Sequence, residues 1–166
     1  MRNILHLYKM IQHKSIQPKS FIGKQADDLS NLILEQIKPI YHSLGIIVPI
    51  KSCSIIHYLD ILNDMSVTNL AKQLNQSHQL IKQKLPKLQK LGLIHQQNDE
   101  NDKRRTTYHL TESGQQQALL LTQHSMYSVY QHLSDEVGAD INQVLASAIL
   151  CLKQKDLFTR FQESNL

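Results

Sequence analysis

The sequence has 166 residues, of which 41% are hydrophobic and 19% charged, and its formal net charge is +4. This length is enough for one compact domain with a core, or for a small domain with an oligomerisation element, and it excludes two large domains. Tryptophan is absent, and the chain has only five glycines and four prolines. Helix is therefore predicted for most of the chain.

The chain carries no pattern typical of export or of a membrane span. His6 and Lys9 interrupt the apolar run at the start of the sequence, which is unlike a signal peptide. No stretch approaches the roughly 20 apolar residues of a membrane-spanning helix. Cys53 and Cys151 are too far apart to suggest a disulfide framework. These features predict a soluble cytoplasmic protein without a membrane partner.

Two helices are expected before the centre of the chain. The first is a short amphipathic helix at residues 3–13. The second covers residues 24–44, where apolar residues recur every three or four positions and Gly45 ends the pattern. Pro39 lies inside this second helix and is expected to bend or split it, because proline lacks the N–H that a helix interior needs.

The central part of the chain predicts a helix-turn-helix. Residues 52–62 form one apolar-periodic segment, and residues 66–74 read as a short helix capped by a serine or threonine. Asn75 and Gln76 then form a tight turn, and Ser77 can cap the next helix. Two short helices joined by such a turn are typical of a DNA-binding helix-turn-helix.

The helix predicted at residues 77–91 has two different faces. Its apolar face carries Ile81, Leu85 and Leu88, with Leu80 and Leu91 at the edge. The opposite face is polar, basic and rich in amides, with these residues: Gln79, Lys82, Gln83, Pro86, Lys87 and Lys90. Glutamine can pair with adenine and lysine can donate to guanine. The alternative interpretation of this face is ordinary solvation.

Pro86 is unusual at this position. It removes a hydrogen bond from the helix interior and predicts a kink, which either tilts the helix in a DNA groove or is simply tolerated on the exposed side.

A β-hairpin is expected next, after Gly92 ends the helix. Residues 93–97 and 106–110 are compatible with strands, and the loop between them contains Asp102, Lys103, Arg104 and Arg105, which include two of the four arginines of the chain. A helix-turn-helix followed by a hairpin is a winged helix. Thr111 is then expected to cap one long helix that ends at Gly138, and a last helix is expected from residue 141 to Phe161.

The order of these motifs resembles the MarR family of bacterial winged-helix transcriptional regulators. The resemblance lies in Val67-x-x-Leu70-Ala71, Ser77, Leu88-x-x-x-Gly92-Leu93-Ile94, Asp102-x-Arg104-Arg105 and Leu110-Thr111-x-x-Gly114. Each motif alone is weak, but five in this order are specific. The segment before residue 24 and Pro86 depart from the family pattern.

The resemblance implies a mainly α fold with a winged helix-turn-helix, a small antiparallel β-hairpin wing, and terminal helices that form a dimerisation body. The corresponding divisions are residues 1–45 and 112–166 for the dimerisation helices and 46–111 for the winged helix. The implied partners are double-stranded DNA, as a pseudo-palindromic operator, and a second copy of the chain. The implied DNA-binding residues are Ser66, Thr68, Ser77, His78, Gln79, Lys82, Gln83, Lys87, Asp102, Lys103, Arg104 and Arg105. Among these, Arg104 corresponds to the arginine that enters the minor groove, and Asp102 to the acid that orients it.

No motif for catalysis, a metal or a cofactor is found, so we expect no enzyme, no metal site and no cofactor. The nine histidines are dispersed. Cys53 and His57 are four residues apart, but two ligands do not make a zinc site. Cys53 lies near a helix start and close to Lys51, which could lower its pKa, so a redox-sensing regulator is one alternative.

The leading hypothesis is a DNA-binding transcriptional repressor that a small-molecule effector releases. A winged-helix module that binds an acidic protein is the other alternative, and a small-molecule enzyme is a more distant one. An effector is expected in a crevice between the dimerisation body and the winged helix, with candidate lining residues Tyr41, His57, Tyr58 and Tyr127 chosen from position alone.

Overall fold

The computed structural model describes residues 21–98 and 106–164, and the chain divides into two compact units. The first unit extends from Ile22 to His124. The described part of the second comprises Phe21 and residues 125–164. Each unit is considered by itself below.

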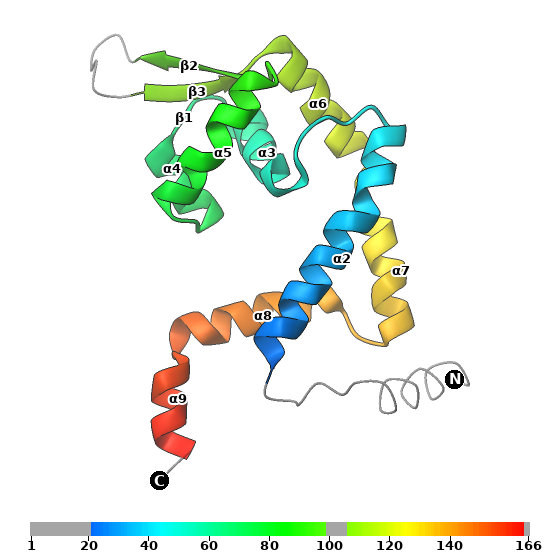
Figure 1. The fold of residues 1–166 in the computed structure, drawn as a ribbon, viewed down its shortest axis with the longest axis vertical. Helices are drawn as coiled ribbons and strands as arrows, with labels where there is room; N and C mark the ends of the chain where they lie inside the picture. The colour runs from blue at the N-terminus through cyan, green and yellow to red at the C-terminus, as the bar shows by residue number, and fades with distance from the viewer. Residues whose placement is uncertain (1–20, 99–105, 165–166) are drawn as a thin grey trace. The chain divides into compact units, whose positions relative to one another are not determined.

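The first unit contains helices and three short strands, shown from blue to light green in Figure 1. In chain order its elements are α2 (Ile22–Ser43), the 3-10 helix η1 (Ile50–Ser52), α3 (Cys53–Leu62), β1 (Met65–Ser66), α4 (Val67–Leu74), α5 (His78–Lys90), β2 (Ile94–Asn98), β3 (Thr106–Leu110) and α6 (Glu112–Gln123). The predicted order of helix, helix-turn-helix and hairpin is confirmed.

The strands form one antiparallel sheet with the order β1-β3-β2. In the hairpin, Ile94 lies opposite Leu110 and Asn98 opposite Thr106. The third strand, β1, pairs Met65 with Tyr108 and was not expected from the sequence. A strand of two residues has no periodicity that a sequence pattern can reveal.

The core of this unit lies between the sheet and helices α3, α4, α5 and α6. Its fully buried side chains are Ile55, Ile56, Leu59, Leu70, Ile81, Leu85, Leu88 and Leu93. On α5, the buried residues are the three predicted for its apolar face, while Leu80 and Leu91 are 39% and 37% exposed. The amphipathic pattern therefore fixes which side of α5 remains outside.

Side-chain caps set the start of three helices. The hydroxyl oxygens of Ser66, Ser77 and Thr111 accept hydrogen bonds from the backbone N–H of Asn69, Leu80 and Gly114, respectively. These bonds satisfy donors that a helix N-terminus leaves unpaired. Asn75 ends α4 in the left-handed conformation, at φ 50°. The turn between α4 and α5 is thus determined by local side chains.

Gln117 fastens the segment between α2 and α3 to α6. Its side chain is buried, its Nε2 donates to the carbonyl oxygen of Gly45 at 3.1 Å, and its Oε1 accepts from the N–H of Ile47 at 2.8 Å. Both ends of the amide are therefore used by one stretch of backbone.

Neither proline splits its helix. Pro39 lies within the continuous α2, and Pro86 lies within the continuous α5. Both prolines are exposed, so the backbone carbonyl that loses its helical partner lies on a side open to water. The expectation that Pro39 could divide the helix is therefore wrong.

The described part of the second unit consists of three helices: α7 (Tyr127–Val137), α8 (Ile141–Gln154) and α9 (Leu157–Ser164). One long helix after Thr111 was expected, and that expectation is wrong, because α6 ends at Gln123 and α7 starts at Tyr127. The hydroxyl oxygen of Ser125 accepts from the N–H of Tyr127. A serine that bonds local backbone in this way competes with helix continuation.

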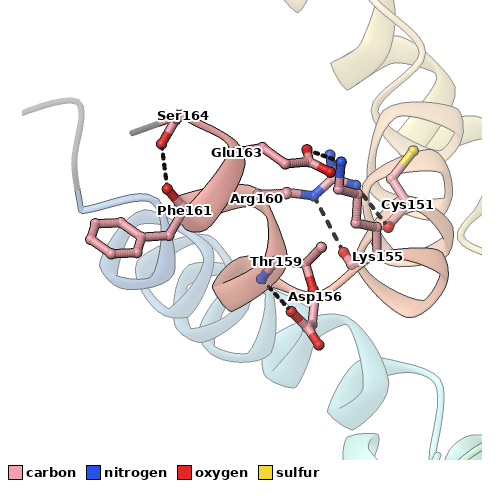
Figure 2. A network of polar contacts seen from close by, with 8 residues as sticks. All are labelled: Cys151, Lys155, Asp156, Thr159, Arg160, Phe161, Glu163 and Ser164. Atoms are coloured by element: carbon pink, nitrogen blue, oxygen red, sulfur yellow. Dashed lines mark hydrogen bonds and ion pairs between the residues drawn. The ribbon is translucent and has the colours of Figure 1, made fainter. Parts of the chain in front are cut away.

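The last predicted helix is also divided, and a polar network fixes the corner between α8 and α9 (Figure 2). Asp156 accepts from the N–H of Thr159 at 2.7 Å, which starts α9. Arg160 donates to the carbonyl oxygens of Cys151 and Lys155, which lie at the end of α8. Lys155 and Glu163 form an ion pair across the corner. The expectation of a single last helix through Phe161 is therefore wrong.

Candidate nucleic-acid interface

The outer face of α5 is polar and cationic. The predicted contacts His78, Gln79, Lys82, Gln83 and Lys87 are all exposed on it. From Ser66 to Asn98 the chain has five lysines and no aspartate or glutamate. A helix face without acidic residues does not repel phosphates, so this surface is suited to DNA.

Three further predicted contacts lie at the starts of α4 and α5. Ser77 is exposed, Ser66 is half-buried, and Thr68 is exposed in the first turn of α4. The serine oxygens cap the helices, as described above, and a serine hydroxyl can still donate its own hydrogen. The backbone N–H groups and the dipole at these helix ends favour a nearby anion. The capping serines thus keep a donor hydrogen of their own at two helix starts, and their predicted contacts with DNA stay predictions.

Lys84 differs from the other lysines of α5. It is half-buried, and its Nζ donates to Oε1 of Gln76 at 2.8 Å, so it holds the turn onto the helix. Burial and the nearby charge of Lys51 lower the pKa of Lys84. Its place on the inner side of α5 agrees with its omission from the predicted DNA contacts.

The wing is described up to the base of its tip. Strands β2 and β3 form its stem, which projects away from the helices in Figure 1. Asp102, Lys103, Arg104 and Arg105 lie outside the described residues. Their predicted roles in the minor groove and on phosphates therefore stay predictions.

Sequence reasoning missed a pair of histidines on the stem. His95 and His109 are opposite each other in the register, and their rings are stacked with centroids 5.3 Å apart. Oγ1 of Thr107 lies 3.0 Å from Nε2 of His109. The equal spacing of the two histidines from the hairpin loop is the signal that could have revealed the pair.

A cavity of about 650 Å³ opens between α2, the segment before α3, and α5. Its lining residues are Asn31, Leu34, Glu35, Lys38, Tyr41, His42, Ile46, Val48, Pro49, Ile50, Lys51 and Lys87. Sequence reasoning named only Tyr41 of these as a candidate effector contact. His57 and Tyr58 do not line this cavity; their rings meet edge to face at 5.8 Å on α3. Tyr127 belongs to the other unit.

Cys53 lies at the start of α3, and burial raises the pKa of its thiol. Its Sγ lies 3.7 Å from the hydroxyl oxygen of Tyr41 and 3.7 Å from the carbonyl oxygen of Pro49, and its single S–H can donate to only one of them at a time. The suggestion that the helix start and Lys51 lower the Cys53 pKa is therefore wrong, because loss of hydration on burial outweighs the hydrogen bonds that lower this pKa.

Within residues 21–98 and 106–164, no three histidine, cysteine, aspartate or glutamate side chains gather as a metal site would require. In the same part of the chain, every helix is too short or too polar to cross a membrane.

Residues 53–114 match the protein family described as "Winged helix DNA-binding domain". This range includes α3, the helix-turn-helix, the wing and the first residues of α6. The chain therefore contains a winged helix DNA-binding domain. None of the curated proteins matches the chain by sequence.

Solved structures with the same fold include three regulators or sensors. The heme sensor protein PefR from Streptococcus agalactiae is 16% identical, with a TM-score of 0.56, over 84% of this chain and 97% of the other. The adhesin competence repressor AdcR from Streptococcus pyogenes is 23% identical, with a TM-score of 0.56, over 81% and 96%. The transcriptional regulator PA4135 is 20% identical, with a TM-score of 0.58, over 84% and 99%.

The winged helix domain that the sequence resemblance implied is confirmed by the family match, and the fold by these structures. The mainly helical fold with a small antiparallel sheet is also as predicted.

Proposed function

We propose that this chain is a transcriptional repressor that binds a pseudo-palindromic DNA operator as a homodimer and is released by a small-molecule effector. The observation that carries the proposal is the exposed face of α5, which combines amides and lysines on a winged helix DNA-binding domain. Gln79 and Gln83 are assigned to base edges, and Ser77, Lys82 and Lys87 to bases or phosphates.

The exposed apolar faces of the terminal helices support the proposed dimer. No residue of α8 or α9 is buried, and their apolar side chains include Val144, Ile149 and Leu150, which are 57%, 55% and 56% exposed. Short helices are marginal in water without a packed apolar face. A second copy of the chain would cover these faces and present two recognition helices, about 34 Å apart, to successive major grooves.

The repressor and effector assignments are supported by the structural neighbours and by the cavity. Two structural neighbours are named as a repressor and a heme sensor. The cavity beside α5 offers a place for a ligand within reach of the recognition helix. A ligand that prefers the lobe spacing unsuited to DNA would release the operator.

The decisive experiment is to sequence genomic fragments retained by the purified chain and to test them, with the region upstream of its own gene, in gel shifts. We expect one enriched palindromic sequence. Gln79→Ala should change base preference, whereas Gln115→Ala, on the exposed side of α6, should not. Arg104→Ala should weaken binding to all DNA and reduce the salt slope by about 1.

Absence of any retained fragment or gel shift would contradict DNA binding and favour the protein-interaction alternative. For the dimer, light scattering should give twice the 19.1 kDa of one chain; a monomer at all concentrations would contradict that assignment. The redox alternative has no specific support, because burial disfavours the Cys53 thiolate.

A further inference from the structure

We propose that Pro86 gives α5 a fixed backbone acceptor, the carbonyl oxygen of Lys82, and that this oxygen selects a cytosine or adenine amine in the major groove. This inference rests on the proposed function, because it concerns how α5 chooses bases. It adds a backbone contact to the side-chain contacts assigned to Gln79 and Gln83, and it gives a role to the proline that departs from the family pattern.

The proline removes one hydrogen bond from the middle of α5. In a regular α-helix the N–H of residue 86 would donate to the carbonyl oxygen of residue 82, but proline has no N–H. Pro86 is the ninth of the thirteen residues of α5, and the helix continues to Lys90. The Lys82 carbonyl therefore lies well before the last four carbonyls, which lack helical donors in any helix. It is an additional acceptor within the helix whose regular donor is missing.

This acceptor belongs to the outer face of α5. Lys82 and Pro86 are both exposed, as are Gln79 and Gln83. Carbonyl groups on the solvent side of a helix tilt outward toward water, so the Lys82 oxygen is open to a partner outside the helix. Residues three or four apart lie on the same side of a helix. The carbonyl therefore falls within the few base pairs that Gln79 and Gln83 would contact.

A backbone carbonyl discriminates between bases because it can only accept a hydrogen bond. From Ser66 to Asn98 the chain has no aspartate or glutamate, the side chains that commonly accept from the cytosine amine. Lysine only donates, and a glutamine amide can turn to present either its donor or its acceptor. In the major groove, cytosine and adenine present amines, whereas the O6 and N7 of guanine and the O4 of thymine are acceptors. The Lys82 carbonyl would favour the first pair and disfavour the second.

The first test compares base preference and stability in two alanine variants of the full chain. Pro86→Ala restores the N–H that engages the Lys82 carbonyl, and Pro39→Ala makes the same change in the interior of α2, where Pro39 is also exposed. Both should raise the melting temperature by at least about 3 °C, since proline is unfavourable inside a helix. Only Pro86→Ala should lose discrimination at one base pair, by about fivefold, the size expected for one neutral hydrogen bond. Selection from random DNA followed by gel shifts measures the preference.

The second test removes single amines from the DNA. In the sequence selected by the native chain, each adenine in turn is replaced by purine and each cytosine by 2-pyrimidinone, which lack only the exocyclic amine. At one position this change should weaken binding of the native chain by about fivefold and leave binding of Pro86→Ala unchanged. Lys82→Ala removes the side chain and keeps the carbonyl, so it should bind all DNA more weakly and still respond to loss of the same amine. Circular dichroism establishes that each variant is folded.

Three outcomes would overturn the inference: a native chain that is insensitive to amine removal at every position, a Pro86→Ala protein with native base discrimination, or a Pro86→Ala protein that keeps the full amine response. The last would mean that the proline acts through the geometry of the helix and not through the carbonyl. In all three, the native chain would still bind its operator. Failure of the proposed function would appear differently, as a native chain that retains no DNA fragment.

Discussion

The two units of the chain use the same kind of amphipathic helix with opposite results. In the winged-helix unit, Ile55, Ile81 and Leu88 are fully buried at 0% exposure. On α8, by contrast, no residue is buried and Ile149 remains 55% exposed. An apolar stripe therefore predicts that a face will be covered, but not by which part of the chain or by which copy of it. The first unit supplies its own cover, whereas the described part of the second leaves the apolar side chains of α8 exposed.

The largest effect should come from truncating the core of the winged-helix unit. We expect Leu59→Ala to lower the free energy of unfolding by about 2–5 kcal/mol, since Leu59 is 1% exposed and the substitution leaves a cavity. Ile61→Ala on the same helix, where Ile61 is 57% exposed, should cost less than about 0.5 kcal/mol. Urea denaturation measures both. Equal losses would show that α3 does not face the core as described.

A smaller loss is expected at the closest backbone approach in this unit. Gly114 is buried in the first turn of α6, and a Cβ there would overlap the carbonyl oxygen of Leu93. Because that neighbour is backbone and cannot rotate away, Gly114→Ala should destabilise the fold by about 1–3 kcal/mol. Gly23→Ala in α2, where nothing lies within 4 Å, is the control. Thermal melting that ranks the two in the opposite order would contradict this packing.

A substitution on the terminal helices should change how strongly two chains associate and should leave the folding of the winged helix unchanged. Ile149→Asp introduces a charge into the exposed apolar face of α8 and should weaken the proposed dimer at least about tenfold, which corresponds to about 1.4 kcal/mol. Sedimentation at several protein concentrations measures this, with Asn142→Asp as a charge-matched control on the same helix. Unchanged association of Ile149→Asp would locate the dimer contact elsewhere.

Ser77 allows stability and DNA binding to be separated within the first unit. Ser77→Ala removes the cap of α5 and should cost about 1 kcal/mol of stability. Ser77→Asp retains a capping oxygen but places a negative charge on the DNA-facing surface, so it should leave the unfolding midpoint nearly unchanged and weaken DNA binding at least about fivefold. If Ser77→Asp binds DNA as the native chain does, the start of α5 does not face phosphates.

The smallest effect concerns the two cysteines. Cys53 has a raised pKa from burial, whereas Cys151 is exposed on α8. A raised pKa keeps the Cys53 thiol protonated in the folded chain as the pH increases. The contribution of this buried neutral thiol to the stability of the fold is therefore complete at neutral pH, and it is lost as the pH rises through the folded-state pKa. Iodoacetamide at pH 8 should therefore modify Cys53 more slowly than Cys151, as mass spectrometry of peptides can measure. Faster modification of Cys53 would restore the redox hypothesis.

Local chemistry made much of the winged helix predictable from sequence. Ser77 and Thr111 were recognised as caps because their oxygens act within three residues, and the buried side of α5 followed from its period. The breaks after Gln123 and Gln154 were missed, because an apolar stripe can continue in register across a short interruption. Arg160, which closes the second break, had no local signal, since its acceptors Lys155 and Cys151 lie five and nine residues earlier.

The cavity could not be foreseen for a different reason. Lys38, Lys51 and Lys87 meet only because α2, η1 and α5 pack together. No spacing rule connects residues that far apart in the chain, so the sequence predicted Lys87 to be a DNA contact and did not predict that it lines a cavity. Lys84 shows the same limit, since its bond to Gln76 depends on how α5 folds back on the turn.

The amide of Gln117 has a mechanical consequence for the proposed dimer. Its two hydrogen bonds, to Gly45 and Ile47, hold the backbone segment after α2 rigidly against α6. Any swing of α2 against the winged helix must first release both bonds, at about 0.5–1.5 kcal/mol each. In the proposed dimer, these two bonds are expected to keep the distance between the two recognition helices unchanged during small thermal movements of α2.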